Sequence, residues 1–152
     1  MKIVLDTNVL VSGLLTPFGA SAQIVRMVAS SHLVVCFDVR ILAEYEEVLS
    51  RPKFDFPEAA VSALLDQIEG EGISLATAPL RTTLPDRDDE PFLEVAVAAN
   101  LETPDDPVAL VTGNSKHFPE ESRQGVSVVS PRYFIDAYGE STAGETSPSL
   151  LD

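Results

Sequence analysis

Short apolar runs alternate along this chain with segments whose apolar residues recur at helical spacing. The candidate buried strands are residues 2–6, 33–37, 108–112 and 126–129, with a shorter one at residues 73–76. A strand that is apolar on both sides needs cover on both faces of its sheet, which is typical of parallel sheets. The alternation therefore predicts an α/β fold in which a central parallel sheet carries helices on both faces.

The segments between the strands carry helical patterns and helix-capping residues. The predicted helices are residues 9–15, 20–30, 39–50, 57–70, 91–100 and 132–138. Asp38 is placed to cap the third of them, and Ser130 to cap the last. From Gly139 onward the chain is rich in Ser, Thr, Gly, Glu and Pro and has little to bury. We therefore expect one domain over residues 1–138 and a disordered tail over residues 139–152.

The composition excludes several classes of protein. A length of 152 residues fits one domain. No apolar run reaches the ~18 residues of a membrane helix, and the run after Lys2 is too short for a signal peptide. We therefore expect a cytoplasmic protein without membrane contact. The single cysteine, Cys36, cannot form an internal disulfide, and the sequence offers no Cys/His cluster for zinc.

The formal net charge of −14 constrains the ligands of this protein. Such a charge argues against nucleic-acid binding through a large basic face, because neutralising phosphates requires clustered Lys and Arg. It favours cations or a basic protein as partners. A nucleic acid would therefore have to bind through local basic groups or through a bound metal ion.

Polar residues follow three of the predicted strands. Ligands of parallel α/β sheets bind at the carboxyl ends of the strands, which directs attention to Asp6, Asp38 and Asn114. An acid on the helix after the second strand can reach the same edge. Helical periodicity places Glu44 on one flank of the apolar face and Glu46 on the other, so it leaves both open.

The segment before the fifth predicted helix supplies further acids. When this helix is extended backward, Asp89 falls on the inward face that Phe92 and Leu93 define, and Glu90 falls off it. Asp88 is its direct neighbour. Taken singly, these acids also fit ordinary roles at helix starts, as Asp6 fits a helix N-cap and Asn114 a turn.

Several carboxylates in one cleft repel one another unless they take up protons or a cation. Oxygen ligands without His or Cys suit Mg²⁺ or Mn²⁺. Such a site can activate a water molecule towards a phosphodiester. Because these acids fall at the same end of one sheet, the pattern favours a functional site over their separate ordinary roles.

Four stretches of the chain together resemble the PIN-domain family, in particular the branch of toxins from bacterial toxin–antitoxin pairs. They are IVLDTNVLVSGLL (3–15), ILAEYEEVLSRPKF (41–54), DRDDEPFLEVAVAA (86–99) and ALVTGNSKHFP (109–119). The resemblance implies a three-layer α/β sandwich with a central parallel sheet and an acidic site for Mg²⁺ or Mn²⁺. It also implies an endoribonuclease that acts on RNA, forms a homodimer and is silenced by a cognate antitoxin protein.

The resemblance also assigns roles to residues of this chain. Asp6, Glu44 and Asp89 would be the catalytic acids and metal ligands, with Asp88 as a neighbour or substitute of Asp89. The hydrogen-bonding supports of these acids would be Asn8 and Thr112.

The chain departs from the family pattern after its TG turn. Many relatives carry a fourth acid there, where this chain has Asn114. An amide can ligate through its oxygen but brings no charge, so both one and two metal ions remain open. The side chains near the predicted cleft that can contact phosphate are Lys116, His117 and Arg87.

Two other functions compete with the nuclease. The first is a catalytically weak or inactive PIN scaffold that acts by binding a partner, which the missing fourth acid and the acidic charge favour. The second is a receiver-like phospho-acceptor module, for which Asp38 and Lys116 give some support. Receivers carry paired acids after the first strand, whereas Thr7 and Asn8 follow Asp6 here.

Overall fold

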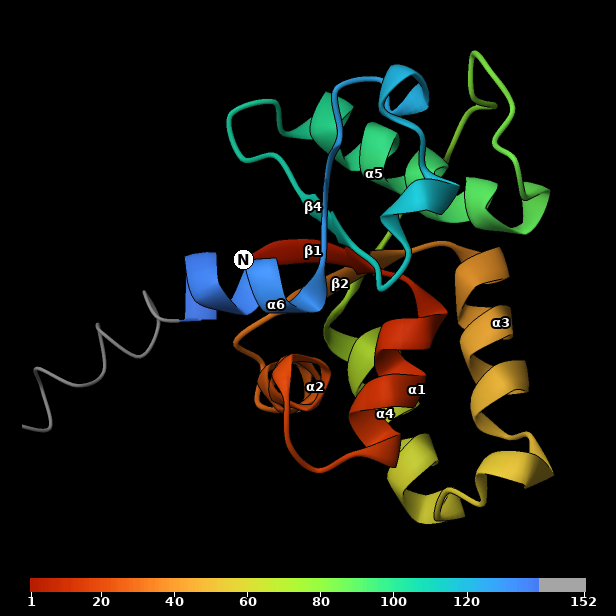
Figure 1. Cartoon of the computed structure of the whole chain (residues 1–152), viewed down its shortest axis with the longest axis vertical. Coiled ribbons are helices and arrows are strands. Elements are labelled where there is room, and N and C mark those ends of the chain that lie inside the picture. Colours follow the sequence, from red (N-terminus) through yellow and green to blue (C-terminus); the bar gives the residue numbers. More distant parts are fainter. Residues whose placement is uncertain (140–152) are drawn as a thin grey trace, which may run out of the picture.

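The computed structural model describes residues 1–139 and contains one sheet of five parallel strands (Figure 1). The strands are β1 (Lys2–Leu5), β2 (Val34–Phe37), β3 (Ile73–Ser74), β4 (Ala109–Val111) and β5 (Ser127–Val129). Their order across the sheet is β3-β2-β1-β4-β5. The buried patterns of β1, β2 and β4 confirm that these apolar runs lie inside the molecule.

Helices cover both faces of the sheet and complete the predicted three-layer sandwich. They are α1 (Thr7–Leu15), α2 (Ala20–Ala29), α3 (Val39–Leu49), α4 (Glu58–Glu71), α5 (Glu90–Glu102) and α6 (Pro131–Phe134). Helix α5 packs against β1, β2 and β4 from one side, and Figure 1 shows the other five on the opposite side. The α/β class and the parallel sheet predicted from the alternation are therefore confirmed.

The boundaries of three helices differ from the sequence-based prediction. Helix α1 begins two residues before its predicted start at residue 9, so that Thr7 and Asn8 form its first turn. Helix α4 spans Glu58–Glu71 and is thus shifted by one residue at each end from the predicted range of residues 57–70. The last helix is α6 followed by a π-helical turn, Ile135–Gly139. Residues 140–152 of the predicted tail lie outside the described residues, so the prediction of disorder there stays untested.

The strand order creates a switch point in the middle of the sheet. From β1 the chain moves to β2 and β3 on one side, and it then returns to place β4 and β5 on the other. The connections therefore leave β1 and β4 in opposite directions, which opens a crevice at their carboxyl ends. Asp6 directly follows β1, and Thr112 directly follows β4.

A buried aromatic residue ties α3 to the central strand. The Tyr45 side chain is fully buried, and its hydroxyl donates a hydrogen bond to the Leu5 carbonyl oxygen at 2.5 Å. Its ring packs against Phe92 of α5, with 6.5 Å between the ring centroids. Because Leu5 precedes Asp6, this contact fixes α3 relative to the strand end at the crevice.

No single helix in residues 1–139 has the length and apolar character needed to cross a membrane. Helices α1 and α2 pass that test only when taken as one pair, which is bent by 101° at its break.

Two neighbouring glycines allow a test of the packing between α4 and β2. A Cβ at Gly72 would lie 2.6 Å from the Val35 carbonyl oxygen and would also meet the Ile68 carbonyl oxygen, whereas a Cβ at Gly70 meets nothing. We expect Gly72→Ala to destabilise the fold by about 1–3 kcal/mol. Gly70→Ala should stabilise it by up to ~1 kcal/mol, because alanine favours the helix. Denaturant unfolding of both variants checks this, and equal effects would contradict the described packing.

Candidate active site

Asp6 lies at the switch point of the sheet and is buried, with 6% of its surface exposed. Although Asp6 occupies the N-cap position of α1, its side chain makes no capping hydrogen bond. Its Oδ2 instead accepts a hydrogen bond from the Thr112 hydroxyl at 2.7 Å. Burial raises the pKa of Asp6, and the Thr112 bond offsets part of that rise. The backbone N–H groups of Thr7 and Asn8 at the start of α1 also lower its pKa, so Asp6 interacts with the helix start as well as with Thr112.

Glu44 reaches the same region from α3. The Thr7 hydroxyl donates a short hydrogen bond to Glu44 Oε2 and thereby links the first turn of α1 to α3. The pKa of Glu44 is raised, first by burial and then by the negative charges of Asp6 and Asp88. Glu46 is exposed to solvent. The structure thus places Glu44, and not Glu46, within electrostatic reach of Asp6.

Asp89 enters the site from the 3₁₀ helix η2 (Arg87–Asp89), which precedes α5. Its Oδ2 is buried and has no hydrogen-bond partner among the described residues. The ring Nδ1 of His117 lies 3.0 Å from this oxygen, a contact that becomes an ion pair when the imidazole is protonated. Burial first, and then the charge of Asp6, raises the pKa of Asp89 from its ordinary value of 3.8 to about 6.

The neighbouring acids of Asp89 have other surroundings. Asp88 is exposed, and its backbone N–H donates to Asp86 Oδ1 at 2.9 Å. Helical periodicity placed Glu90 off the inward face, but its side chain is partly buried. The reason is that its Oε2 accepts a hydrogen bond from the backbone N–H of Leu84 at 2.9 Å. Of the two candidates at residues 88 and 89, Asp89 is thus the one whose side chain is withdrawn from solvent next to Asp6.

The two residues predicted to support the acids act in different ways. Thr112 binds Asp6 directly, and its Oγ1 also accepts the backbone N–H of Asn114 at 3.0 Å. The Asn8 side chain is exposed and touches no carboxylate; its Oδ1 accepts the Gly113 N–H at 3.3 Å. Asn8 therefore holds the loop after β4, and through that loop the position of Thr112.

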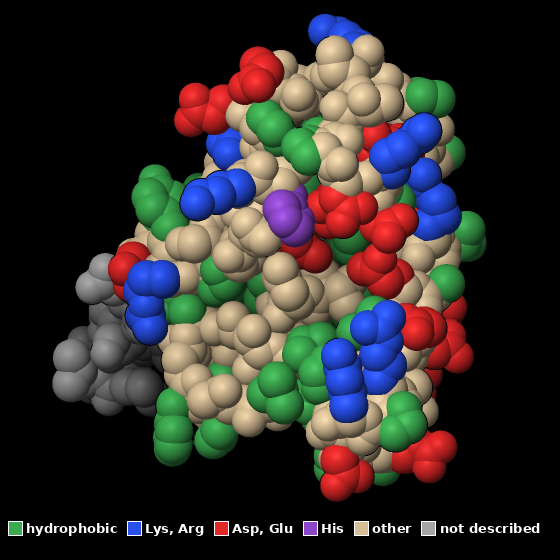
Figure 2. Space-filling view, turned by 45° about the vertical axis from the view of Figure 1, so that its right-hand side comes forward, with side chains coloured by type: hydrophobic (Ala, Val, Ile, Leu, Met, Phe, Trp, Pro, Cys, Tyr) green, Lys and Arg blue, Asp and Glu red, His purple; other side chains and the backbone are tan. Residues whose placement is uncertain are grey.

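Basic side chains flank the acids on the molecular surface. Figure 2 shows a histidine next to a cluster of acidic side chains, with Lys and Arg side chains on either side of that cluster. Lys116 is exposed beside His117 in the 3₁₀ helix η3 (Ser115–His117). Arg87 is 79% exposed and lies 3.8 Å from Glu90. Both cations can reach a ligand without breaking a close ion pair.

Two features of this region escaped the sequence analysis. Thr7, which lay outside the predicted helices, supports Glu44 through its hydroxyl. Arg40 donates to Asp38 and also to Glu94 Oε1, at 2.8 Å, so that it clamps the start of α3 to α5. A charged Glu94 among the apolar residues of α5 was the signal for a buried partner.

The side chain of Asp38 has a structural role that weakens the receiver-like interpretation. It caps α3 by accepting the backbone N–H groups of Arg40 and Ile41. Its second oxygen binds the Arg40 guanidinium. A phospho-acceptor needs a free carboxylate oxygen as its nucleophile, and both oxygens of Asp38 are engaged.

The donor chemistry of the site fits a divalent cation. Within residues 1–139, no three His, Cys, Asp or Glu side chains converge as a ready-made set of ligands. However, Asp6, Glu44 and Asp89 have raised pKa values, and the buried Asp89 Oδ2 lacks a hydrogen bond. A hard cation such as Mg²⁺ or Mn²⁺ would offset the repulsion and bind the unpartnered oxygen.

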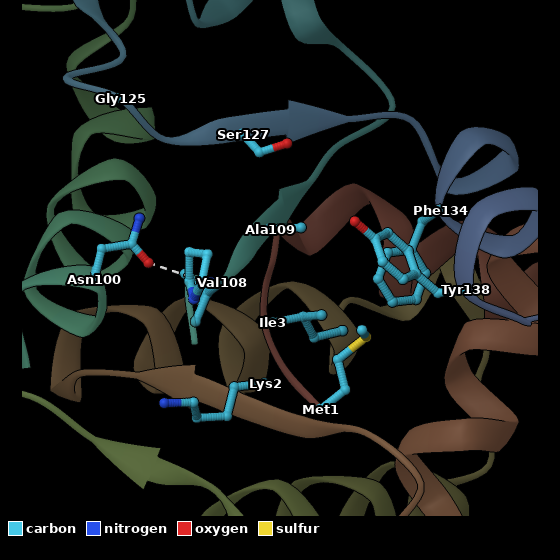
Figure 3. Close-up of a pocket in the computed structure, with 11 residues that line it drawn as sticks. Met1, Lys2, Ile3, Asn100, Val108, Ala109, Gly125, Ser127, Phe134 and Tyr138 are labelled. Atoms are coloured by element: carbon cyan, nitrogen blue, oxygen red, sulfur yellow. Dashed lines mark hydrogen bonds between the residues drawn. The ribbon is translucent and has the colours of Figure 1, made fainter. Parts of the chain in front are cut away.

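Two cavities differ in what they offer to a ligand. An open groove of about 520 Å³ borders η2 and is lined by Arg40, Thr77, Arg87 and other polar residues. A smaller pocket of about 180 Å³ lies at the amino ends of β1 and β4, where Figure 3 shows Phe134, Tyr138 and Met1 along one side. The acids lie at the carboxyl ends of these strands, away from the smaller pocket. The groove reaches η2 through Arg87, but Asp6, Glu44 and Asp89 do not line it.

Comparison with known proteins gives one match. A family model described as PIN domain matches residues 2–116, a span that includes Asp6, Glu44, Asp89 and Asn114. The comparisons with curated proteins and with solved structures found no significant match.

The raised pKa of Asp89 predicts how pH affects the metal-free protein. Since the carboxylate titrates near 3.8 in an unfolded chain and near 6 in the fold, folding favours the protonated acid. The stability that this preference contributes is present below pH 3.8 and is lost as the pH rises through 6. We expect Asp89→Asn, measured in EDTA, to raise the midpoint of thermal unfolding by about 2–4 °C at pH 8 and less at pH 4.5.

Asp88→Asn is the matched control for this experiment, because its exposed side chain is the direct neighbour. It should leave the midpoint nearly unchanged at both pH values. A lower midpoint for Asp89→Asn at pH 8 would show that Asp89 stabilises the metal-free fold, contrary to this account.

Proposed function

Because this chain belongs to the PIN-domain family, whose members are generally nucleases, we propose that it is an Mg²⁺- or Mn²⁺-dependent endoribonuclease. The observation that carries the proposal is the set of three acids, Asp6, Glu44 and Asp89, that come from separate segments. Burial raises the pKa of each, and the charge of Asp6 further raises the pKa of Glu44 and of Asp89. Such a set lowers the stability of the folded protein. A bound cation would offset the repulsion and so explain why the acids lie together.

Asp6, Glu44 and Asp89 are the residues that would hold the metal ion. The chemistry that a divalent ion supplies at such a site is Lewis acidity towards the phosphate and the attacking water. The Thr112 hydroxyl fixes the orientation of the Asp6 carboxylate, and the Thr7 hydroxyl fixes that of Glu44. These hydrogen bonds keep the carboxylates from turning away from one another.

Exposed cations beside the acids would bind the RNA backbone. Lys116 lies in η3 on one side, and Arg87 lies in η2 and lines the polar groove. A strand that crosses the acids would contact both, so a chain with net charge −14 would still bind RNA locally. Addition of water across the P–O3′ bond would leave a 5′-phosphate and a 3′-hydroxyl, as the family resemblance implies.

We further propose that the protein is the toxin of a toxin–antitoxin pair and forms a homodimer. The resemblance to the toxin branch supports this role, and the net charge of −14 favours a basic antitoxin segment as partner. Exposed apolar side chains near the turn between α1 and α2, Leu15 and Phe18, are candidates for the dimer contact.

A partner-binding scaffold without catalysis is the second candidate function. Asn114 favours it, because this residue brings no charge where many relatives have an acid. The scaffold and the nuclease differ in a direct assay, since a scaffold cuts no RNA at any Mg²⁺ or Mn²⁺ concentration.

Glu44 and Glu46 provide a matched pair for testing the nuclease. We expect purified protein to cleave RNA with Mn²⁺ or Mg²⁺ and to stop in EDTA. Glu44→Gln should lower the rate by about 100-fold or more, because loss of a ligand exceeds the 10–100-fold cost of losing a supporting contact. Glu46→Gln, which alters an exposed acid of the same helix, should cleave at the normal rate.

Cleavage that continues in EDTA would contradict the proposed metal dependence. A rate that falls equally in both variants would contradict the proposed role of Glu44. No cleavage by the unaltered protein over a wide range of RNAs and Mn²⁺ concentrations would favour the scaffold.

The salt dependence of RNA binding tests the proposed phosphate contacts. In the cleavage-blocked Asp6→Asn background, Lys116→Ala and Arg87→Ala should each weaken RNA binding. Each should also reduce the slope of log affinity against log salt by about 0.7, the value for one phosphate contact on single-stranded RNA. Arg26→Ala serves as the control, because Arg26 lies on α2 and binds the Pro17 carbonyl. An equal loss of slope in all three variants would indicate a general charge effect.

A further inference from the structure

We propose that His117 supplies a nitrogen ligand to the metal ion through Nδ1, beside Asp89, in place of the acid that this chain lacks at residue 114. The inference rests on the proposed metal-dependent function and adds to it a ligand and a preference among metals. It also changes the role of Asn114, which becomes the residue that orients His117.

The distance between His117 and Asp89 is the first observation that supports this ligand. His117 Nδ1 lies 3.0 Å from Asp89 Oδ2, a buried oxygen without a hydrogen-bond partner by geometric criteria among the described residues. Two neighbouring ligands of one octahedral ion, each about 2.1 Å from it, lie about 3.0 Å apart. The two atoms are therefore spaced as adjacent ligands of a common cation.

The contact of the other ring nitrogen, Nε2, with Asn114 is the second observation. His117 Nε2 lies 2.9 Å from the side-chain amide nitrogen of Asn114. A histidine that binds a metal donates its other ring N–H to an oxygen, which fixes the tautomer. Rotation of the Asn114 amide by a half-turn presents its oxygen to Nε2–H. The lone pair of Nδ1 then faces Asp89.

The loop after β4 connects this pair to the other acids. The backbone N–H of Asn114 donates to Thr112 Oγ1, and the Thr112 hydroxyl donates to Asp6. An unbroken series of polar contacts thus runs from Asp6 through Thr112, Asn114 and His117 to Asp89. This series holds the imidazole at a fixed position relative to both carboxylates.

A nitrogen ligand changes which metal the site prefers. Mg²⁺ is a hard ion that binds oxygen ligands, whereas imidazole adds affinity for first-row transition ions. Coordination by His117 should therefore make the site bind Mn²⁺ more tightly than Mg²⁺. A site with a fourth acid instead of His117 would discriminate less between the two.

Pulsed electron paramagnetic resonance of bound Mn²⁺ tests the ligand directly. A coordinated imidazole gives a ¹⁴N modulation of the electron spin echo. The chain has two histidines, and the second, His32, is exposed and contacts the Ser30 hydroxyl. We expect ¹⁴N modulation in the unaltered protein and in His32→Gln, and its loss in His117→Gln.

Binding titrations with the metals alone complete the test. His117→Gln should raise the Kd for Mn²⁺ by about 10-fold or more and change that for Mg²⁺ by less than about 2-fold. His32→Gln should change neither. Thermal unfolding in EDTA verifies that both variants are folded.

The outcomes separate this inference from the proposed function. Mn²⁺ that binds with a dependence on Asp89 but shows no ¹⁴N modulation would overturn the role of His117 and leave the metal-dependent nuclease standing. Modulation that persists in His117→Gln would also overturn it. Failure of the unaltered protein to bind Mn²⁺ would reject the inference and the metal dependence together.

Discussion

The burial of Asp6, with its charge acting on two partly buried acids, is the constraint on which the rest of this site depends. The strand order places Asp6 at the switch point, and Glu44 and Asp89 come within its electrostatic reach from α3 and from the start of α5. Gathering such acids costs stability in the metal-free protein. A bound ligand of positive charge would offset this cost. A divalent cation can do so at a site whose ligands are carboxylate oxygens, with or without one imidazole nitrogen.

The surrounding contacts hold the acids in place despite that repulsion. Thr112 and Thr7 each donate a hydroxyl to one carboxylate, and the Tyr45 hydroxyl anchors α3 to the strand that leads to Asp6. Arg40 ties the start of α3 to α5 through Glu94. These contacts join segments that lie far apart in the sequence, so the geometry of the site depends on the packing of the whole sheet.

The sequence predicted the parts of this arrangement that follow from local rules. Strand ends in a parallel sheet pointed to Asp6. The helical phase before α5 placed Asp89 on the inward face, but it left Asp88 open and wrongly placed Glu90 off that face. Glu44 and Glu46 could not be separated by periodicity, since their burial depends on how α3 packs against α5 and α1. The contacts of Thr7, Asn114 and His117 could not be predicted from the sequence. Loop conformations and partners that are distant in the sequence leave no periodic pattern of residues. The four-part resemblance to PIN domains supplied the choice of Glu44, and the family itself is confirmed.

The most direct measurement of the central claim is anomalous diffraction from crystals of this protein grown or soaked with Mn²⁺. The account predicts an anomalous peak in the crevice between Asp6 and Asp89, within ligand distance of both carboxylates, and its loss in crystals of Asp89→Asn. A bound Mn²⁺ at any other place, with the crevice empty at saturating Mn²⁺, would contradict the view that these acids form a metal centre.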